Sequence, residues 1–186
     1  MIKNNFIYLI LLSMALSDTY KEPQYNLIKK DKKIEIRQYS EYVIAKTSID
    51  KGSSEQNSNM FRVLAGYIFG GNANNESIPM TAPVITQSND SNYDMIFFML
   101  DANKIEELPN PNNQNVVLDK MKIGKTVSIT FGMWATDKRV TYYKDKLDKY
   151  IRKNNIQVTS SLMVAQYNSP WTIPPFRKNE LIYTIK

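Results

Sequence analysis

The chain has 186 residues, of which 42% are hydrophobic and 23% are charged, and its formal net charge is +6. This length supports a buried core, and so small and dispersed a positive charge argues against a nucleic-acid-binding protein. The sequence contains no cysteine and no histidine. Their absence excludes disulfides, the common zinc sites and the Ser-His-Asp and Cys-His nucleophile systems.

The N-terminus is typical of a targeting segment. Phe6 to Leu16 is an apolar run of 11 residues, and Ala15 and Ser17 offer small residues at the two positions that a signal peptidase requires. The run is too short to span roughly 30 Å of hydrocarbon as a helix. We therefore predict a signal peptide over residues 1–17, a secreted or periplasmic protein, and no stable membrane insertion after cleavage. The alternative is an N-terminal membrane anchor that the protein keeps.

The remaining chain, residues 18–186, divides into two halves. The first half alternates short strands with one helix. The sequence YNLIKKDKKIEIRQY, residues 25–39, alternates apolar and polar residues around Asp31-Lys32 and indicates a β-hairpin. A third strand is expected over residues 42–49. Helical spacing over residues 53–71 predicts a helix that Ser53 or Ser54 caps and that Gly70-Gly71 ends. Two further strands are expected over residues 83–87 and 93–100.

The second half repeats this order of elements. Strands are expected over residues 116–124 and 125–135, a helix over 139–155, and strands over 161–168 and 180–186. Within residues 125–135, alternation places Val127, Ile129, Phe131 and Met133 on one face. Each half is thus strands, a helix and two strands, although the halves share little sequence identity. Since two helices cannot cover two separate small sheets, we expect one domain with a shared core.

The sequence NSPWTIPPFRKNE, residues 168–180, is the most unusual stretch of the chain. Its three prolines cannot donate backbone hydrogen bonds, so the segment is predicted to be a stiff, extended loop before the last strand. Trp171 and Phe176 either plug the end of the core or form the wall of a pocket. The adjacent basic pair, Arg177 and Lys178, suits a flat apolar ligand that carries carboxylates.

Five segments together resemble the SOUL haem-binding protein family over roughly Tyr20 to Lys186. They are EIRQY, YIFGGN, IPMTAPV, VSITFGMWA and YNSPWTIPPFRKNELIYTIK. The resemblance implies an α+β fold, a distorted antiparallel β-barrel built from two pseudo-repeated ββαββ-like halves with two packed helices. It also implies that haem or another tetrapyrrole binds in a cleft beside the first helix and near the final strand connection.

One type of member in this family uses a histidine as an axial haem ligand, which is impossible in this chain. The leading hypothesis is therefore a non-catalytic protein that binds haem or a related tetrapyrrole without a histidine ligand. Apolar side chains would cover the macrocycle, basic side chains would meet the propionates, and a Met or Tyr could reach the iron. The candidates to cover the macrocycle are Phe61, Leu64, Ile68, Trp171 and Phe176. The candidates to meet the propionates are Arg62, Arg177 and Lys178, and the candidates to reach the iron are Met60 and Tyr67.

Two other functions remain open at this point. One is a binding module for another apolar small molecule or for a protein partner, because fold does not fix function. The other is a tetrapyrrole-modifying enzyme in which Glu35 or Glu180 donates a proton. Both glutamates lie in strand patterns where exposed salt bridging is the ordinary role. We expect a monomer, no nucleic-acid partner, and no cofactor other than haem as a ligand.

Overall fold

The computed structural model describes residues 20–51 and 57–186. The predicted signal peptide and the predicted helix caps Ser53 and Ser54 lie outside the described residues. Within the described part, no helix has both the length and the apolar character that crossing a membrane requires.

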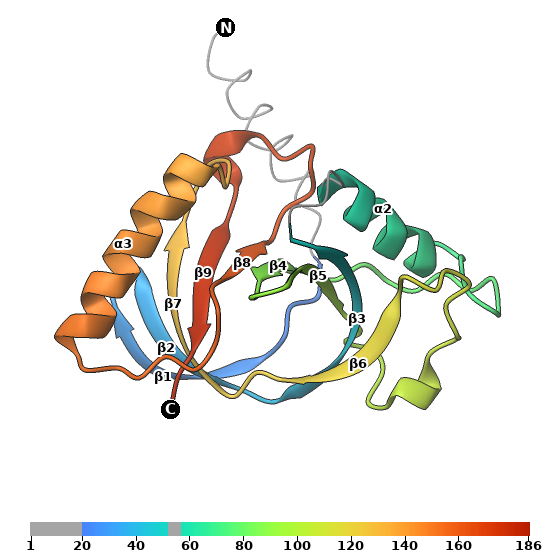
Figure 1. The fold of residues 1–186 in the computed structure, drawn as a ribbon, viewed down its shortest axis with the longest axis horizontal. Helices are drawn as coiled ribbons and strands as arrows, with labels where there is room; N and C mark the ends of the chain where they lie inside the picture. The colour runs from blue at the N-terminus through green and yellow to red at the C-terminus, as the bar shows by residue number, and fades with distance from the viewer. Residues whose placement is uncertain (1–19, 52–56) are drawn as a thin grey trace, which may run out of the picture.

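Nine strands, two α-helices and two short 3₁₀ helices follow one another in the described residues (Figure 1). The helices are α2 (Asn57–Ile68) and α3 (Asp137–Lys153), with η1 (Ile105–Glu107) and η2 (Pro174–Phe176). The strands are β1 (Tyr25–Asp31), β2 (Ile34–Tyr39), β3 (Glu41–Asp50), β4 (Val84–Ser88), β5 (Asn92–Phe98), β6 (Val117–Lys122), β7 (Lys125–Phe131), β8 (Met163–Gln166) and β9 (Asn179–Thr184). The predicted α+β class is confirmed.

All nine strands form one curled sheet in the order β1-β2-β7-β9-β8-β4-β5-β3-β6, and every neighbouring pair is antiparallel. The order reveals the predicted pseudo-repeat, because β2-β3-α2-β4-β5 and β6-β7-α3-β8-β9 occupy equivalent places. The first strand of each half pairs with the second strand of the other half, β2 with β7 and β6 with β3. These two pairings and the β4–β8 pairing join the two halves into one sheet.

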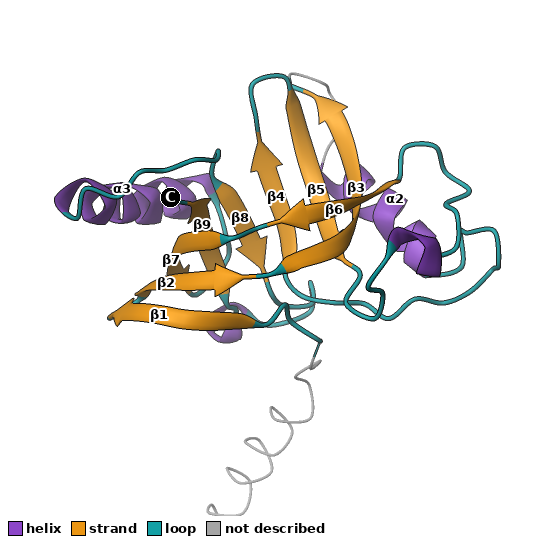
Figure 2. Ribbon diagram, turned by 90° about the horizontal axis from the view of Figure 1, so that it is seen from below, coloured by secondary structure: helices purple, strands orange, loops and turns teal. Residues whose placement is uncertain are grey.

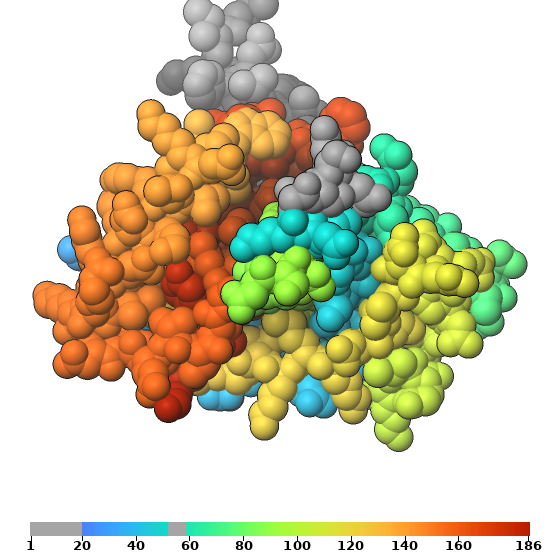
Figure 3. All heavy atoms as spheres, in the orientation of Figure 1, coloured from blue at the N-terminus to red at the C-terminus, as the bar shows by residue number. Residues whose placement is uncertain are grey.

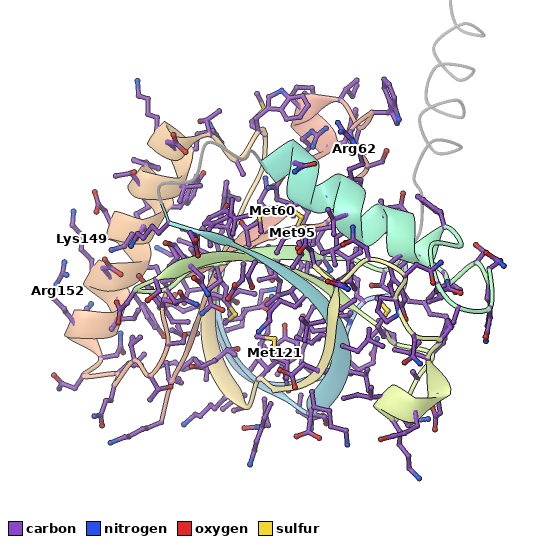
Figure 4. The ribbon with its side chains drawn as sticks, turned by 45° about the vertical axis from the view of Figure 1, so that its right-hand side comes forward. Met60, Arg62, Met95, Met121, Lys149 and Arg152 are labelled. Atoms are coloured by element: carbon purple, nitrogen blue, oxygen red, sulfur yellow. The ribbon has the colours of Figure 1, made fainter. Side chains whose placement is uncertain are left out.

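The two helices lie at opposite ends of the sheet (Figure 2). Helix α2 packs on β3 and β5, and α3 packs on β7 and β9. A third apolar cluster fills the inside of the curl, where Ile44, Phe98, Met163 and Ile182 meet. Figure 4 shows the difference between the layers: Met60 and Met95 lie beneath α2, whereas Met121 points into the curl.

The predicted apolar face of β7 is confirmed for three of its four residues. Val127, Ile129 and Phe131 are buried against α3. The prediction was wrong for Met133, because β7 ends at Phe131 and the chain turns at Met133, where φ is +71°. The Met133 side chain is therefore exposed. Alternation continues only as long as the backbone stays extended.

The opposite face of β7 supports a buried ion pair. Arg37 on β2 donates to Glu180 on β9 through two parallel hydrogen bonds of 2.8 and 2.7 Å, and both side chains are buried. The β7 residues that face the same side, Thr126, Ser128 and Thr130, are small and leave room for this pair. The ion pair therefore ties β2 to β9 across the strand that lies between them.

Further groups satisfy the remaining hydrogen-bonding positions of this ion pair. The Tyr167 hydroxyl donates to Glu180 at 2.6 Å, and the Thr130 hydroxyl donates to its other oxygen at 3.1 Å. Arg37 also donates to Glu35 and to the Tyr39 hydroxyl. The sequence-based expectation of solvent-exposed carboxylates was wrong, because Glu180 is fully buried and the Glu35 side chain is only 12% exposed. The alternation of these strands did not reveal that both of their faces are covered.

The charges of this cluster are stabilised by one another. Burial opposes ionisation of Glu180, but the hydrogen bonds and charge of Arg37 outweigh burial and hold its pKa below the usual range. For Glu35, hydrogen bonds from Lys30 and Arg37 likewise outweigh burial and lower the pKa. Burial raises the pKa of the Tyr167 phenol well above its ordinary value, so this group remains a hydrogen-bond donor. Both carboxylates are therefore ionised at neutral pH.

Breaking the ion pair on one side is expected to destabilise the protein strongly. Arg37→Met leaves the Glu180 carboxylate buried without its counter-charge, and Glu180→Leu leaves the Arg37 guanidinium buried without its carboxylate. Each substitution should therefore lower the free energy of unfolding by about 3–5 kcal/mol. The double variant Arg37→Met/Glu180→Leu should recover much of that loss, because neither charge remains. Urea unfolding measures the cycle. Lys120→Ala, which breaks an exposed pair with Glu41, is the control and should cost less than about 1 kcal/mol. Strictly additive losses would contradict the predicted coupling.

Stability should also fall in acid for a defined reason. The pKa values of Glu35 and Glu180 are lowered by folding, so the unfolded chain binds more protons than the folded protein below a pH of about 4.3. The two glutamates contribute fully to the free energy of unfolding above that pH. This contribution is lost as the pH falls through the pKa values that they have in the folded protein. Urea midpoints between about pH 6 and pH 3 should drop less steeply in Glu35→Gln than in the unaltered protein. Equal pH slopes would show that Glu35 is not one of the linked groups.

Candidate functional site

Helix α2 presents two different faces. Met60, Leu64 and Ile68 are at most 1% exposed and pack toward β3 and β5, as does the ring of Tyr67. Phe61 is half-buried and its ring centroid lies 5.5 Å from that of Phe97. The outer face carries Arg62, Val63 and Gly66. Most of the predicted apolar contacts on this helix therefore belong to the core beneath it.

A groove runs along the outer side of α2. Its volume is about 760 Å³, within the range of about 300–1,000 Å³ that is usual for small-molecule sites. Its second wall is the segment before β6, which lies against α2 in Figure 3. The lining residues are Arg62, Val63, Gly66, Tyr67, Gly71, Asn112, Asn113, Gln114 and Asn115. The groove thus brings two of the predicted site residues, Arg62 and Tyr67, together with residues 112–115, for which the sequence analysis predicted no function.

Glycines shape the end of this groove. Gly70 has a φ of +101°, and a Cβ at Gly71 would lie 2.5 Å from the carbonyl oxygen of Gly66. Only glycine therefore allows the Gly71 N–H to donate to Gly66 at 2.8 Å and end the helix there. By contrast, a Cβ at Gly66 would meet no atom within 4 Å. The missing side chain at Gly66 leaves the groove open.

Asn72 fixes the turn that follows the helix. Its side chain is buried, donates to the carbonyls of Tyr67 and Glu76, and accepts from the backbone N–H groups of Asn74 and Glu76. The backbone of the turn is also joined to the second wall, because the Asn112 N–H donates to the Gly71 carbonyl at 3.1 Å. The two walls of the groove are therefore held in a fixed relation.

The groove has a positive and amide-rich lining. Arg62 is exposed, and none of the ion pairs within the described residues involves it. Side-chain amides from residues 112–115 add donors and acceptors, and the described lining residues include no Asp or Glu. Such a site favours a ligand with carboxylates over a cationic one. The Asn-rich composition of residues 112–115 was the available signal for this wall, but it indicates a turn equally well.

The two candidate iron ligands do not offer their ligating atoms to this groove. The Tyr67 hydroxyl donates to the Pro109 carbonyl at 2.9 Å, and burial raises its pKa to about 12. Met60 is 1% exposed in the layer between the helix and the sheet. The sequence also contains no His or Cys, so neither of these side chains could supply a ligand atom to the groove.

The residues predicted on the 168–178 loop lie apart from this lining. Arg177 is buried and donates to the carbonyls of Ser169, Pro170 and Thr172, so its guanidinium holds the loop together. Lys178 pairs with Glu22 at 3.0 Å. Trp171 and Phe176 are 91% and 64% exposed. None of these residues lines the α2 groove, and the two rings do not plug the core.

The inside of the curled sheet offers little space. Its cavity of about 20 Å³, which Tyr39, Phe98, Met163 and Tyr167 help to line, is room for about one water molecule. The described residues also contain no group of three or more His, Cys, Asp or Glu side chains that could hold a metal ion. A pocket of about 330 Å³ beside Lys32, Lys33 and Lys146 contains none of the predicted site residues. The outer groove, which is larger and contains two of them, is therefore the candidate site.

Comparisons with known proteins agree with this fold. Similar solved structures include an uncharacterized conserved protein from Listeria innocua (TM-score 0.63, 9% identity, 84% of this chain and 93% of that chain). The C-terminal domain of EcmrR is also similar (TM-score 0.61, 11% identity, 87% and 98%), as is a hydrolase from Listeria innocua (TM-score 0.58, 9% identity, 86% and 94%). At such identities the likeness concerns the fold alone.

The family relationship is carried by the sequence. The comparison with curated proteins found no match. The sequence profile described as SOUL heme-binding protein matches residues 20–184, nearly the whole chain. The chain belongs to the SOUL heme-binding protein family.

Proposed function

We propose that this protein binds haem or a related tetrapyrrole in the α2 groove without a histidine axial ligand and without catalysis. The observation that carries the proposal is the groove itself, which has a suitable volume and an unpaired Arg62 among the described residues. Membership of a family described as heme-binding supports the choice of ligand.

The lining suggests how a tetrapyrrole would be held. Val63 and the bare backbone at Gly66 would contact the flat face of the macrocycle, where burial of apolar surface contributes roughly 25 cal/mol per Å². Arg62 would pair with a propionate, and the amides of residues 112–115 would hydrogen-bond the acidic edge. The loop residues Trp171, Phe176, Arg177 and Lys178 have no part in this proposal.

The acidic residues considered for catalysis support binding rather than turnover. Glu35 and Glu180 are bonded to Arg37, and their lowered pKa values keep them ionised at neutral pH. An ionised carboxylate in a tight ion pair is a poor proton donor. Neither glutamate lines the α2 groove.

Filling the groove at Gly66 should abolish binding while leaving the fold intact. Gly66→Phe places a ring in open space, because a Cβ there meets nothing within 4 Å. We expect at least a tenfold weaker Kd for haemin in a Soret titration. Gly66→Ala is the matched control: it should stabilise the helix by about 0.5–1 kcal/mol and weaken haemin binding much less than Gly66→Phe, because only one methyl group enters the groove. Unchanged haemin affinity in Gly66→Phe would place the ligand elsewhere.

The carboxylate contact can be tested separately. Arg62→Ala should weaken haemin binding about tenfold, the usual value of a partly exposed charge-assisted hydrogen bond. Binding of haemin dimethyl ester, which lacks the carboxylates, should be weak and insensitive to this substitution. Arg152→Ala removes an exposed cation from α3, on the other side of the molecule (Figure 4), and should have no effect. An equal loss of haemin affinity in both arginine variants would show that the effect comes from the net charge of the protein and not from a contact with Arg62.

The absence of an axial ligand also has a spectroscopic consequence. Metal-free protoporphyrin should bind with an affinity within a few-fold of that of haemin, since no bond to iron contributes. Resonance Raman spectra of the ferric complex should contain no band from a Tyr phenolate ligand. Binding of haemin alone, together with a phenolate band that Tyr67→Phe removes, would contradict this mode of binding.

A further inference from the structure

Five large apolar side chains are exposed at one end of the molecule. Trp171, Ile173 and Phe176 project from the 168–178 loop with 91%, 59% and 64% of their surfaces exposed. Met133 and Trp134, from the turn between β7 and α3, are exposed as well. This end lies at the top of Figure 1, where η2 is drawn, opposite the C-terminus. We call these five residues the apolar tip.

The two loops of the apolar tip form one surface. The Arg177 guanidinium stacks on the Trp134 ring at 3.5 Å, and the Asn179 amide donates to the Met133 carbonyl at 2.8 Å. Arg177 also binds three carbonyls of its own loop. Together with Pro170, Pro174 and Pro175, these contacts hold the rings outward. The exposure is therefore built into the loop, since collapse onto the surface would break these bonds.

The loop that carries most of the apolar tip has no acidic residue of its own. Residues 166–179 contain no Asp or Glu, and Lys178, at the base of the loop, pairs with Glu22. Exposed Lys138 stands at the start of the neighbouring helix α3, beside Asp137. Protruding Trp, Ile and Phe side chains with basic residues behind them match the boundary between the headgroups and acyl chains of an anionic bilayer.

The N-terminal end of the described chain lies on the same side of the molecule as the loop of the apolar tip. Lys178 pairs with Glu22 at 3.0 Å, so the first described residues lie near the base of the loop that carries the apolar tip. The apolar run ends at Leu16, and four residues of extended chain reach at most about 14 Å. A membrane that holds that run would therefore lie close to the loop that carries the tip.

We propose that the apolar tip is a membrane-docking surface that inserts Trp171, Ile173 and Phe176 into the interface of an anionic lipid bilayer. The tip protrudes, which suits a deformable phase; a small ligand needs a concave site. Docking of this kind requires no membrane-spanning helix. It would leave the α2 groove free and place a tetrapyrrole-binding protein where apolar ligands partition.

The two tryptophans of the chain allow a local test. In the full-length Trp134→Phe variant, Trp171 is the only tryptophan, so selective excitation of tryptophan reports on the tip alone. With vesicles of phosphatidylcholine and phosphatidylglycerol at 3:1, we expect a blue shift of its emission and quenching by lipids brominated near the headgroup. The local signal separates tip insertion from binding through the N-terminal run. Vesicle binding with unshifted Trp171 emission would overturn the proposal.

A partition measurement supplies the matched control. The full-length variant Trp171→Ser/Ile173→Ser/Phe176→Ser should bind the same vesicles at least tenfold more weakly than the unaltered chain. Leu27→Ser/Ile28→Ser/Phe69→Ser removes three other exposed apolar side chains and should bind as the unaltered chain does. Equal losses in both variants would overturn the proposal. So would a blue shift that depends on protein concentration without lipid, which would assign the tip to a second copy of the chain.

Discussion

The buried ion pair between Arg37 and Glu180 is the interaction on which the rest of the sheet depends. It joins β2 and β9 across β7, whose inward side chains are small enough to leave room for it. Strand β2 comes from the first half of the chain, while β7 and β9 come from the second. The pair therefore lies at a seam between the halves, in an interior where two hydrogen-bonded charges are tolerated only together. Its neighbours Tyr39, Tyr167 and Glu35 complete the polar cluster on the inner face.

Because this polar cluster and the apolar residues beside it fill the curl, the protein cannot place a large ligand inside its sheet. Space for a ligand is found outside, where α2 ends in two glycines and a tight turn organised by Asn72. The same helix serves the core and the groove: Leu64 and Ile68 face inward, and Arg62 and Gly66 face outward. The groove thus rests on a helix that is anchored by its buried side. Its volume and positive lining are the physical basis for the proposed tetrapyrrole site.

The loop before β9 uses its charged residues differently from its aromatic ones. Arg177 is turned inward and satisfies carbonyls of the loop, while Trp171 and Phe176 are turned outward. The sequence suggested that the rings either plug the core or form the wall of a pocket, and that Arg177 and Lys178 meet a ligand. The difference arises because prolines donate no backbone hydrogen bonds to the carbonyls of this loop, and one guanidinium has enough donors to bind three of them. The exposed rings are the result of that arrangement.

The sequence by itself determined the order of elements, the pseudo-repeat and the family, since apolar periodicity, glycines and prolines act locally. It correctly assigned the β7 face of Val127 and Ile129. Tertiary structure alone decided which strands are covered on both faces, and this covering buries Glu180. It also decided that residues 112–115 lie opposite Arg62, and that Arg177 bonds its own loop. These features depend on contacts between segments far apart in the chain, and local patterns carry no information about such contacts.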